Sequence, residues 1–417
     1  MLTKYKLGDL IEVTRGMSLP GEYYSETGEY IRLTMGNFNY NGGGFKENTS
    51  KKDIYYIGPI RNEFVLNKGD IITPLTEQAI GLLGTTAMIP ESGKYIQSQD
   101  VALITCKENI IDHLFCYYLI SSDIVKKQLS AAAQQTKIRH TSPEKIKDCK
   151  VWIPDLDMQK KIGRVLFDID EKIALNTRMN AELEAMAKQL YDYWFVQFDF
   201  PDENGKPYKS SGGKMVFNEE IKRVIPEGWE VKKLKDLTKT PRESITPLDH
   251  PNRAFRHYSI PAYDVCGSYL WERGCNIQSN KFVVSMGQIL VPKLNPWYNR
   301  IIMVDTGVNS ICSTEFVILE VIEECVKGYI YNLVKTNGFI SYCTKGSTGT
   351  SHSQRRVPPE ILRDYSFPYN KGVVSKYSSL VMPMINSYNS NIKQIRSLTL
   401  LRNSLIPILM NGQVTVD

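Results

Sequence analysis

Residues Ile162–Trp194 read IGRVLFDIDEKIALNTRMNAELEAMAKQLYDYW. Within this stretch, one set of mostly apolar residues recurs at alternating steps of four and three: Ile162, Leu166, Ile169, Ile173, Asn176, Asn180, Leu183, Ala187, Leu190 and Trp194. This heptad spacing returns to the same face of an α-helix after every two turns. The stretch therefore predicts one long helix with a continuous seam.

A second heptad series starts 215 residues after the first: Tyr377, Val381, Met384, Tyr388, Asn391, Ile395, Leu398, Arg402, Leu405 and Leu409. A surface amphipathic helix would explain either series alone, but two series at one spacing predict a coiled coil between them. Asn176 falls on Asn391, and we interpret both as polar seam residues that fix register. Tyr377, Tyr388 and Arg402 are weaker seam residues than their counterparts in the first series.

Four further segments recur at offsets of 215 to 227 residues, so the chain contains an internal repeat. The pairs are 7–10 with 234–237, 65–71 with 283–289, 100–104 with 315–319, and 143–146 with 359–362. The offset is 227 residues for the first pair and 218 for the second, and it is nearly constant, at 215 and 216, for the last two. This behaviour is typical of two related domains whose surface loops differ in length.

Each repeat opens with short apolar alternations and continues into helical periodicity. In the first repeat, residues 30–33, 70–73 and 101–105 predict strands, and about 110–133 predict helix. We predict an α+β fold with two mixed α/β domains, two long coiled-coil helices and an internal pseudo-two-fold repeat. The expected boundaries are a first domain 1–155, a helix 156–197, a Pro/Gly loop 198–225, a second domain 226–370 and a helix 371–412.

Composition leaves the class of partner open. The net charge of +6 permits a nucleic-acid partner without demanding one. The eight cysteines form no C-x-x-C pair, and we interpret His113 and Cys116 as lying on a core helix with a buried thiol rather than binding zinc. Scattered cysteines, no expected signal peptide and no apolar run long enough for a membrane favour a cytoplasmic protein.

Several junction segments carry a family resemblance: 134–140 (QQTKIRH), 152–156 (WIPDL), 159–162 (QKKI), 190–198 (LYDYWFVQF), 201–206 (PDENGK) and 225–229 (IPEGW). In this order, and with the repeat, the whole chain resembles the specificity subunit of bacterial type I restriction–modification systems. Each fragment is only moderately specific, so their order and repetition support the match.

That resemblance implies target-recognition domains that each read one half of a split site in double-stranded DNA. It implies that the two helices pack antiparallel as a spacer, that two methyltransferase subunits dock on them, and that motor–nuclease subunits join for restriction. It implies no cofactor in this chain, with S-adenosylmethionine, ATP and Mg²⁺ expected on the partner subunits.

Motifs for catalysis are near misses. The segment Asn295-Pro296-Trp297-Tyr298 nearly matches the N-P-P-Y/F motif of amino-methyltransferases, but the glycine-rich stretch 41–45 lacks the strand–turn–helix context of a methyl-donor site. Two degenerate nuclease-like patterns pair 154–155 with 170–172 and 201–202 with 220–222. We expect no catalytic or metal-binding residue. A self-contained DNA methyltransferase or nuclease, or a coiled-coil scaffold that reads no sequence, remain the alternatives.

Sequence readers present hydrogen-bonding side chains from firm loops. The polar segments 134–142 and 346–356 occupy corresponding positions of the two repeats. The predicted DNA-binding residues of the first repeat are Arg32, Thr34, Asn37, Thr76, Gln78, Gln134, Gln135, Thr136, Lys137, Arg139 and His140. Those of the second are Lys293, Asn295, Tyr298, Arg300, Ser347, Thr348, Thr350, Ser351, His352, Gln354 and Arg355.

Overall fold

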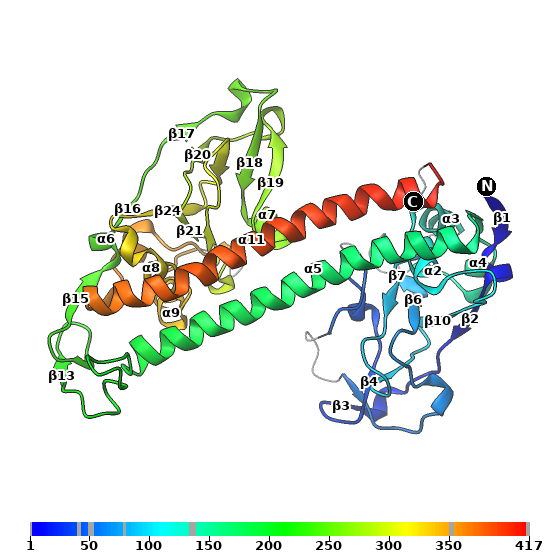
Figure 1. Ribbon diagram of the computed structural model, residues 1–417, viewed down its shortest axis with the longest axis horizontal. Helices are drawn as coiled ribbons and strands as arrows, with labels where there is room; N and C mark the ends of the chain where they lie inside the picture. The colour runs from blue at the N-terminus through cyan, green and yellow to red at the C-terminus, as the bar shows by residue number, and fades with distance from the viewer. Residues whose placement is uncertain are drawn as a thin grey trace. The chain divides into compact units, whose positions relative to one another are not determined.

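The computed structural model describes residues 2–39, 43–48, 54–77, 81–132, 139–349 and 354–413. The chain divides into two compact units, Met1–Ile173 with Ser397–Asp417, and Ala174–Arg396 (Figure 1). The two long helices, α5 (Leu156–Tyr191) and α11 (Lys371–Met410), each contribute to both units. These units therefore differ from the predicted domain boundaries, which treat each helix as a separate segment.

The first unit combines small, mostly antiparallel sheets with short helices. Its main sheet has the order β2-β10-β6-β8, and a second sheet has the order β3-β5-β4-β9. Its strands are β1 Thr3–Lys6, β2 Ile11–Arg15, β3 Tyr24–Ser25, β4 Tyr30–Arg32, β5 Tyr55–Tyr56, β6 Ile71–Pro74, β7 Thr76–Glu77, β8 Ala87–Met88, β9 Tyr95–Ile96, β10 Val101–Cys106, β11 Arg139–His140 and β12 Lys150–Ile153. Its short helices are α1 Leu7–Leu10, α2 His113–Ile120, α3 Asp123–Ala132 and α4 Pro143–Lys147.

The three strands predicted in this unit are confirmed as β4, β6 and β10. The predicted helical stretch 110–133 is instead two helices, because the chain turns at Ser121 and Ser122. Both serine hydroxyls donate to carbonyls of α2, and Ser122 Oγ lies 2.6 Å from Leu119 O. Side chains that bond the backbone in this way compete with helix continuation.

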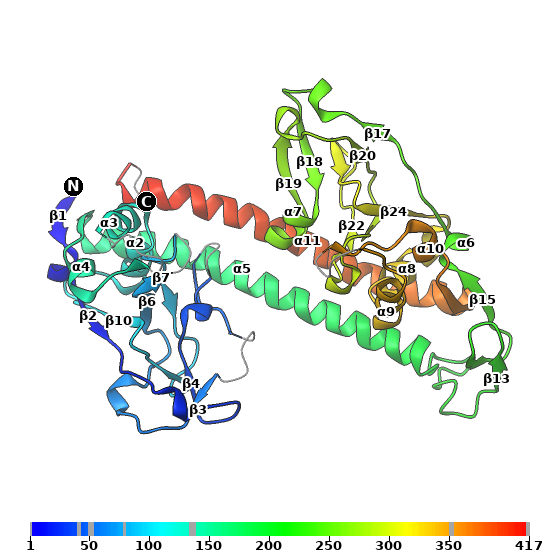
Figure 2. The same cartoon turned by 180° about the vertical axis from the view of Figure 1, so that it is seen from behind.

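The second unit repeats this design with longer sheets. Its sheets have the orders β16-β24-β21-β22 and β17-β20-β23-β18-β19, and Figure 2 shows β18 and β19 side by side. The strands are β13 Met215–Asn218, β14 Arg223–Pro226, β15 Glu230–Lys233, β16 Thr238–Lys239, β17 Ser244–Ile245, β18 Ala254–Tyr258, β19 Tyr269–Arg273, β20 Lys281–Val283, β21 Ile289–Pro292, β22 Ile302–Met303, β23 Ser310–Cys312, β24 Phe316–Val321 and β25 Ser366–Tyr369. The short helices are α6 Leu234–Leu237, α7 Ile260–Cys266, α8 Lys327–Leu333, α9 Asn337–Lys345 and α10 Pro359–Arg363.

The predicted Pro/Gly loop 198–225 is wrong in part, because it contains most of an antiparallel hairpin, β13 with β14. Alternating residues such as Val216 and Ile225 pair across this hairpin, and the density of proline and glycine around it concealed the alternation. Beside it, the rings of Phe200 and Tyr208 stack at 4.8 Å. The segment therefore has a packed structure.

In the second unit the two long helices form a seam closed by amides. Asn391 Nδ2 donates to Asn180 Oδ1 at 2.9 Å, and Asn176 Nδ2 donates to Gln394 Oε1 at 3.2 Å. Further along, Tyr377 donates its hydroxyl to Ala187 O at 3.0 Å. Partner numbers rise on one helix as they fall on the other, so the helices run antiparallel here. Asn176 and Asn391 are buried in the seam, as predicted.

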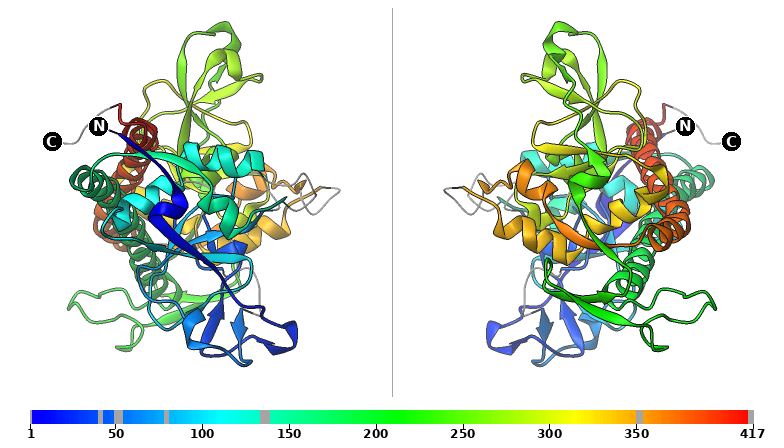
Figure 3. Two further views of the ribbon diagram at one scale, coloured as in Figure 1. Left: turned by 90° about the vertical axis from the view of Figure 1, so that its right-hand side faces the viewer. Right: turned by 90° about the vertical axis from the view of Figure 1, so that its left-hand side faces the viewer.

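The first unit closes its part of the seam with a charge pair. Arg402 Nη1 donates to Asp170 Oδ1 at 2.6 Å, and the same carboxylate accepts the Tyr118 hydroxyl at 2.7 Å. Leu409 packs in the core of this unit, and Gly412 lies against Leu2, so in the end-on views of Figure 3 the end of α11 lies near β1. Arg402 is thus a buried, paired seam residue. The predicted α+β fold with long helices is confirmed.

Candidate nucleic-acid interface

In each unit the chain that follows the polar loop pairs with other backbone, as a short strand in the first unit and through isolated β-bridges in the second. In the first, β11 lies antiparallel to β7, with Arg139 opposite Glu77 and His140 opposite Thr76. In the second, Arg356 pairs with both Leu294 and Thr348. The structure therefore brings Thr76, Arg139 and His140 together in one unit, and Asn295, Ser347, Thr348 and Arg355 together in the other. Gln78, Gln134, Gln135, Thr136, Lys137, Thr350, Ser351 and His352 lie outside the described residues.

A buried carboxylate organises the first of these sites. Glu77 Oε2 accepts the backbone N–H groups of Gly81, Leu82 and Leu83 at 2.8 to 3.0 Å. Its other oxygen pairs with Arg139 Nη1 at 3.1 Å, with the Glu77 side chain 1% exposed. Sequence reasoning missed Glu77, although Thr76 and Gln78 on either side of it were both predicted to bind DNA. The signal available in the sequence was an acidic residue, Glu77, between two polar residues predicted to bind DNA.

The second site uses an amide where the first uses the carboxylate. Asn295 has a φ of 49°, and its Oδ1 accepts the backbone N–H of Arg355 at 3.2 Å, while its own N–H donates to Arg355 O at 2.8 Å. Arg355 Nη2 donates to Ser347 O at 2.6 Å. The amide oxygen of this methyltransferase-like motif is therefore bonded within the protein.

Other predicted residues differ in what they leave accessible. Asn37 is buried, and it accepts the Thr34 N–H and donates to Lys46 O. Arg32 lies over the ring of Tyr24, with 3.9 Å from its guanidinium carbon to the ring centroid. Such groups need rearrangement before they can meet a base.

Tyr298 is exposed beneath Arg300, which also makes two hydrogen bonds to Asp264. His140, Thr348 and Gln354 are exposed, whereas Lys293 is half-buried. Among the described candidates, the exposed side chains are the ones best placed to reach DNA without rearrangement.

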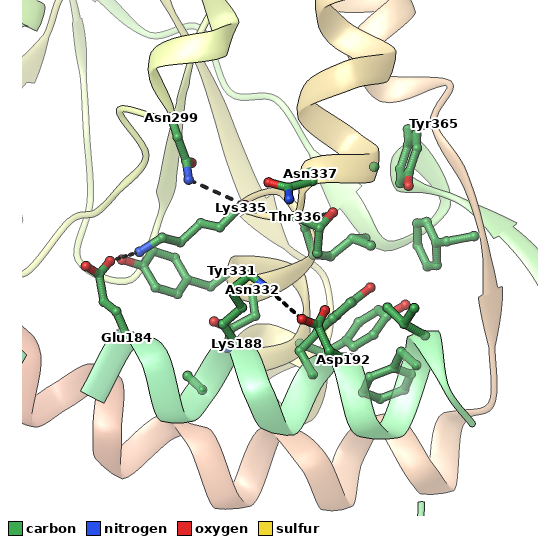
Figure 4. Close-up of a pocket in the computed structure, with 18 of the residues that line it drawn as sticks. Glu184, Lys188, Asp192, Asn299, Tyr331, Asn332, Lys335, Thr336, Asn337 and Tyr365 are labelled. Carbon is green, nitrogen blue, oxygen red and sulfur yellow. Dashed lines mark hydrogen bonds and ion pairs between the residues drawn. The ribbon is translucent and has the colours of Figure 1, made fainter. Parts of the chain in front are cut away.

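The second unit also contains a cavity of about 850 Å³, lined by α5, α8, α11 and the start of α9 (Figure 4). Lys335 forms an ion pair with Glu184, and Lys188 pairs with Asp192 at 2.5 Å. Although burial lowers the pKa of Lys335, Tyr331 and Glu184 together hold it above its usual value. Because these charges are already paired within the cavity, we do not assign it to DNA phosphates.

Cys116 and Asp170, which belong to the candidate zinc and nuclease patterns of the sequence, have structural contacts within the first unit. Cys116 is buried on α2, as predicted. Hydrogen bonding with Cys116 and His113, against the opposing effect of burial, lowers the pKa of Cys106 to about 6. In the nuclease-like pattern, Asp170 is held by Arg402 and Tyr118. Within the described part of the chain, no group of three or more His, Cys, Asp or Glu residues is placed to hold a metal ion.

Residues 2–185 match the protein family described as "Type I restriction modification DNA specificity domain". The matched region contains the sheets and short helices of the first unit and most of α5. The resemblance inferred from the junction segments is confirmed. None of the helices in the described ranges is long and apolar enough to cross a membrane.

Two named relatives cover most of the chain. The specificity subunit of the type I restriction enzyme MjaIX from Methanocaldococcus jannaschii is 25% identical over 330 residues, covering 75% of this chain and 71% of that protein. That of HindI from Haemophilus influenzae is 22% identical over 395 residues, covering 77% and 81%. The crystal structure of a type I S subunit from M. genitalium has the same fold, with a TM-score of 0.61, 14% identity and coverage of 98% and 96%.

Proposed function

We propose that this chain is the sequence-specific DNA-binding (specificity) subunit of a type I restriction–modification complex, and that each unit reads one half of a split site. The observation that carries the proposal is a repeated arrangement in which the chain after a polar loop pairs with other backbone, as a strand in the first unit and through isolated β-bridges in the second. The similarity to named specificity subunits supports the same reading.

Base edges are read by donors and acceptors held on a firm scaffold, and phosphates position the protein without carrying sequence information. Exposed polar side chains beside the return strands suit this task, His140 in the first unit and Thr348 and Gln354 in the second. The two loops differ in composition, which fits two half-sites of different sequence.

The long helices are proposed to dock two methyltransferase subunits, with motor–nuclease subunits joining for restriction. In the second unit, α5 exposes Leu175, Met179 and Met186, which are 39%, 40% and 53% exposed. Their spacing of four and seven residues forms an apolar stripe away from the seam with α11, and such a stripe fits a further helix. S-adenosylmethionine, ATP and Mg²⁺ are assigned by this proposal to the partner subunits.

The experiment is to map methylated bases in cells that carry a type I methyltransferase subunit with or without this chain. We expect methylation at a split site only when both are present, and a changed half-site when residues 226–370 are exchanged for those of a relative. Binding of S-adenosylmethionine by the purified chain alone would favour a self-contained methyltransferase. A complex without sequence preference would favour a scaffold.

A further inference from the structure

Arg139 and Arg355 occupy equivalent positions in the two repeats, and both donate to the backbone that precedes their loop. Arg139 Nη2 donates to Ser130 O at 2.5 Å and to Ser130 Oγ at 3.0 Å, near the end of α3. Arg355 Nη2 donates to Ser347 O at 2.6 Å, just beyond the end of α9. Each arginine thus joins the segment that precedes a polar loop to the segment that follows it.

In the first unit this arginine also joins a third segment. Its Nη1 pairs with Glu77, whose second oxygen holds three consecutive backbone N–H groups at residues 81–83. The Arg139 side chain is 18% exposed, and both of its Nη atoms are engaged. Arg139 and Glu77 therefore connect the end of α3, β11 and the backbone of residues 81–83.

In the second unit the same three segments meet around an amide. Asn295 exchanges two hydrogen bonds with the backbone of Arg355, at 2.8 and 3.2 Å, while the Arg355 side chain bonds Ser347. The neighbouring Arg356 pairs with Glu315 at 3.0 Å. Both repeats therefore connect the same three segments, although the central residue is the charged Glu77 in the first and the neutral Asn295 in the second.

Resting on the proposed function, we infer that Arg139 and Arg355 are positioning residues: clamps that hold the base of each reading loop and do not contact a DNA base. To reach a base edge, Arg139 would have to give up both Ser130 O and the buried Glu77 carboxylate, and Arg355 would have to give up Ser347 O. Removing one member of a buried ion pair leaves the other charge uncompensated, so the arrangement resists opening.

The test uses the complex with its methyltransferase and a DNA panel in which every base of each half-site is changed singly. Arg139→Ala should weaken binding at least about tenfold, because the base of the loop is no longer held in place before DNA binds. Preference should flatten over several adjacent base pairs of one half-site, with the other half-site unchanged. Glu77→Gln should give the same pattern, and the double variant should add little.

Arg139→Lys should restore part of the preference, since lysine can pair with Glu77 but cannot bridge to Ser130 as well. Arg355→Ala, which leaves no buried carboxylate behind, should flatten the other half-site. The matched control is Arg61→Ala in the first unit, whose ion pair with Glu63 is exposed on both sides, and it should change neither half-site.

Relaxed preference at a single base pair after Arg139→Ala, with Glu77→Gln silent, would overturn the clamp and make Arg139 a base reader. Equal loss at both half-sites with a lowered Tm would also overturn it, because the role would then be general to the fold. A wild-type complex without sequence preference would instead overturn the proposed function itself.

Discussion

In both units a short domain helix packs closely against a long helix at a glycine. The glycine lies on the long helix in the first unit and on the short helix in the second. In the first unit Gly163 lies on α5, where an added Cβ would come within 2.7 Å of Phe115 N on α2. The equivalent position on α11 is Ser378, and there the glycine is Gly328 on α8, where a Cβ would lie 2.8 Å from Val381 Cγ2. The glycine that permits the close approach therefore lies on the long helix in the first unit and on the domain helix in the second.

The capping of the domain helix differs in the same way. In the first unit Asp112 accepts the N–H of Phe115 at 2.9 Å, so α2 is capped from its own domain. In the second, Ser378 Oγ accepts the N–H of Tyr329 at 2.9 Å, so α8 is capped by α11. The two repeats therefore keep the same contact between the domain helix and the long helix, although different positions supply the glycine and the cap. Aligning the two repeats residue by residue does not reveal this contact.

The largest expected effect follows from lengthening the two long helices, which should change the spacer of the DNA site and leave what each unit reads unchanged. One heptad inserted after Ile173 and one after Arg396 lengthens each helix by about 10.5 Å. At about 3.4 Å per base pair, the spacer of the recognised site should grow by about three base pairs with both half-sites unchanged. Methylation mapping checks this. An active variant that keeps the original spacer would show that the helices do not set the distance.

Next in size is the difference between a charged seam and a neutral one. Arg402→Ala should lower the free energy of unfolding by about 3 kcal/mol, because Asp170 loses its buried partner. Asn391→Ala, which leaves the amide oxygen of Asn180 without its donor, should cost about 1–2 kcal/mol. Arg164→Ala is the control, since its pair with Asp168 is exposed. Denaturant unfolding measures all three, and a larger loss for Asn391→Ala would reverse the ranking.

A smaller effect should follow at the glycine junction. Gly163→Ala should lower the free energy of unfolding by about 1–3 kcal/mol despite the better helix propensity of alanine, because the new methyl meets the backbone of α2. Gly372→Ala in α11 meets only Asn370 Oδ1 at 3.4 Å and should be neutral or slightly stabilising. Equal outcomes for the two variants would mean that the close approach is not needed.

The smallest effect concerns a cluster found in only one unit. The positions equivalent to Cys106 and His113 are Val321 and Gly328. Because the thiolate is the nucleophile and hydrogen bonding lowers the pKa of Cys106 to about 6, its alkylation should persist at a lower pH than that of an ordinary thiol, near 8.5. Mass spectrometry across pH measures the midpoint. His113→Asn should raise it, and a wild-type midpoint near 8.5 would contradict the assignment.

Sequence periodicity predicted the long helices, the buried Asn176 and Asn391, and several strands, because these features follow from local spacing. It could not find the Glu77–Arg139 pair, whose members lie 62 positions apart and meet only in the folded sheet. It placed Asn37 among DNA-binding candidates because residue type does not reveal burial. Which residue meets which base stays a prediction.

The amide pair between Asn180 and Asn391 also restricts how such a gene can change over generations. A duplication of seven codons in one helix alone would set each amide opposite an apolar residue, at a cost of about 1–3 kcal/mol for each unpaired group. A matching duplication in the other helix restores the pairing. New spacer lengths are therefore expected to arise in paired steps, with one change in each helix at positions that face each other across the seam.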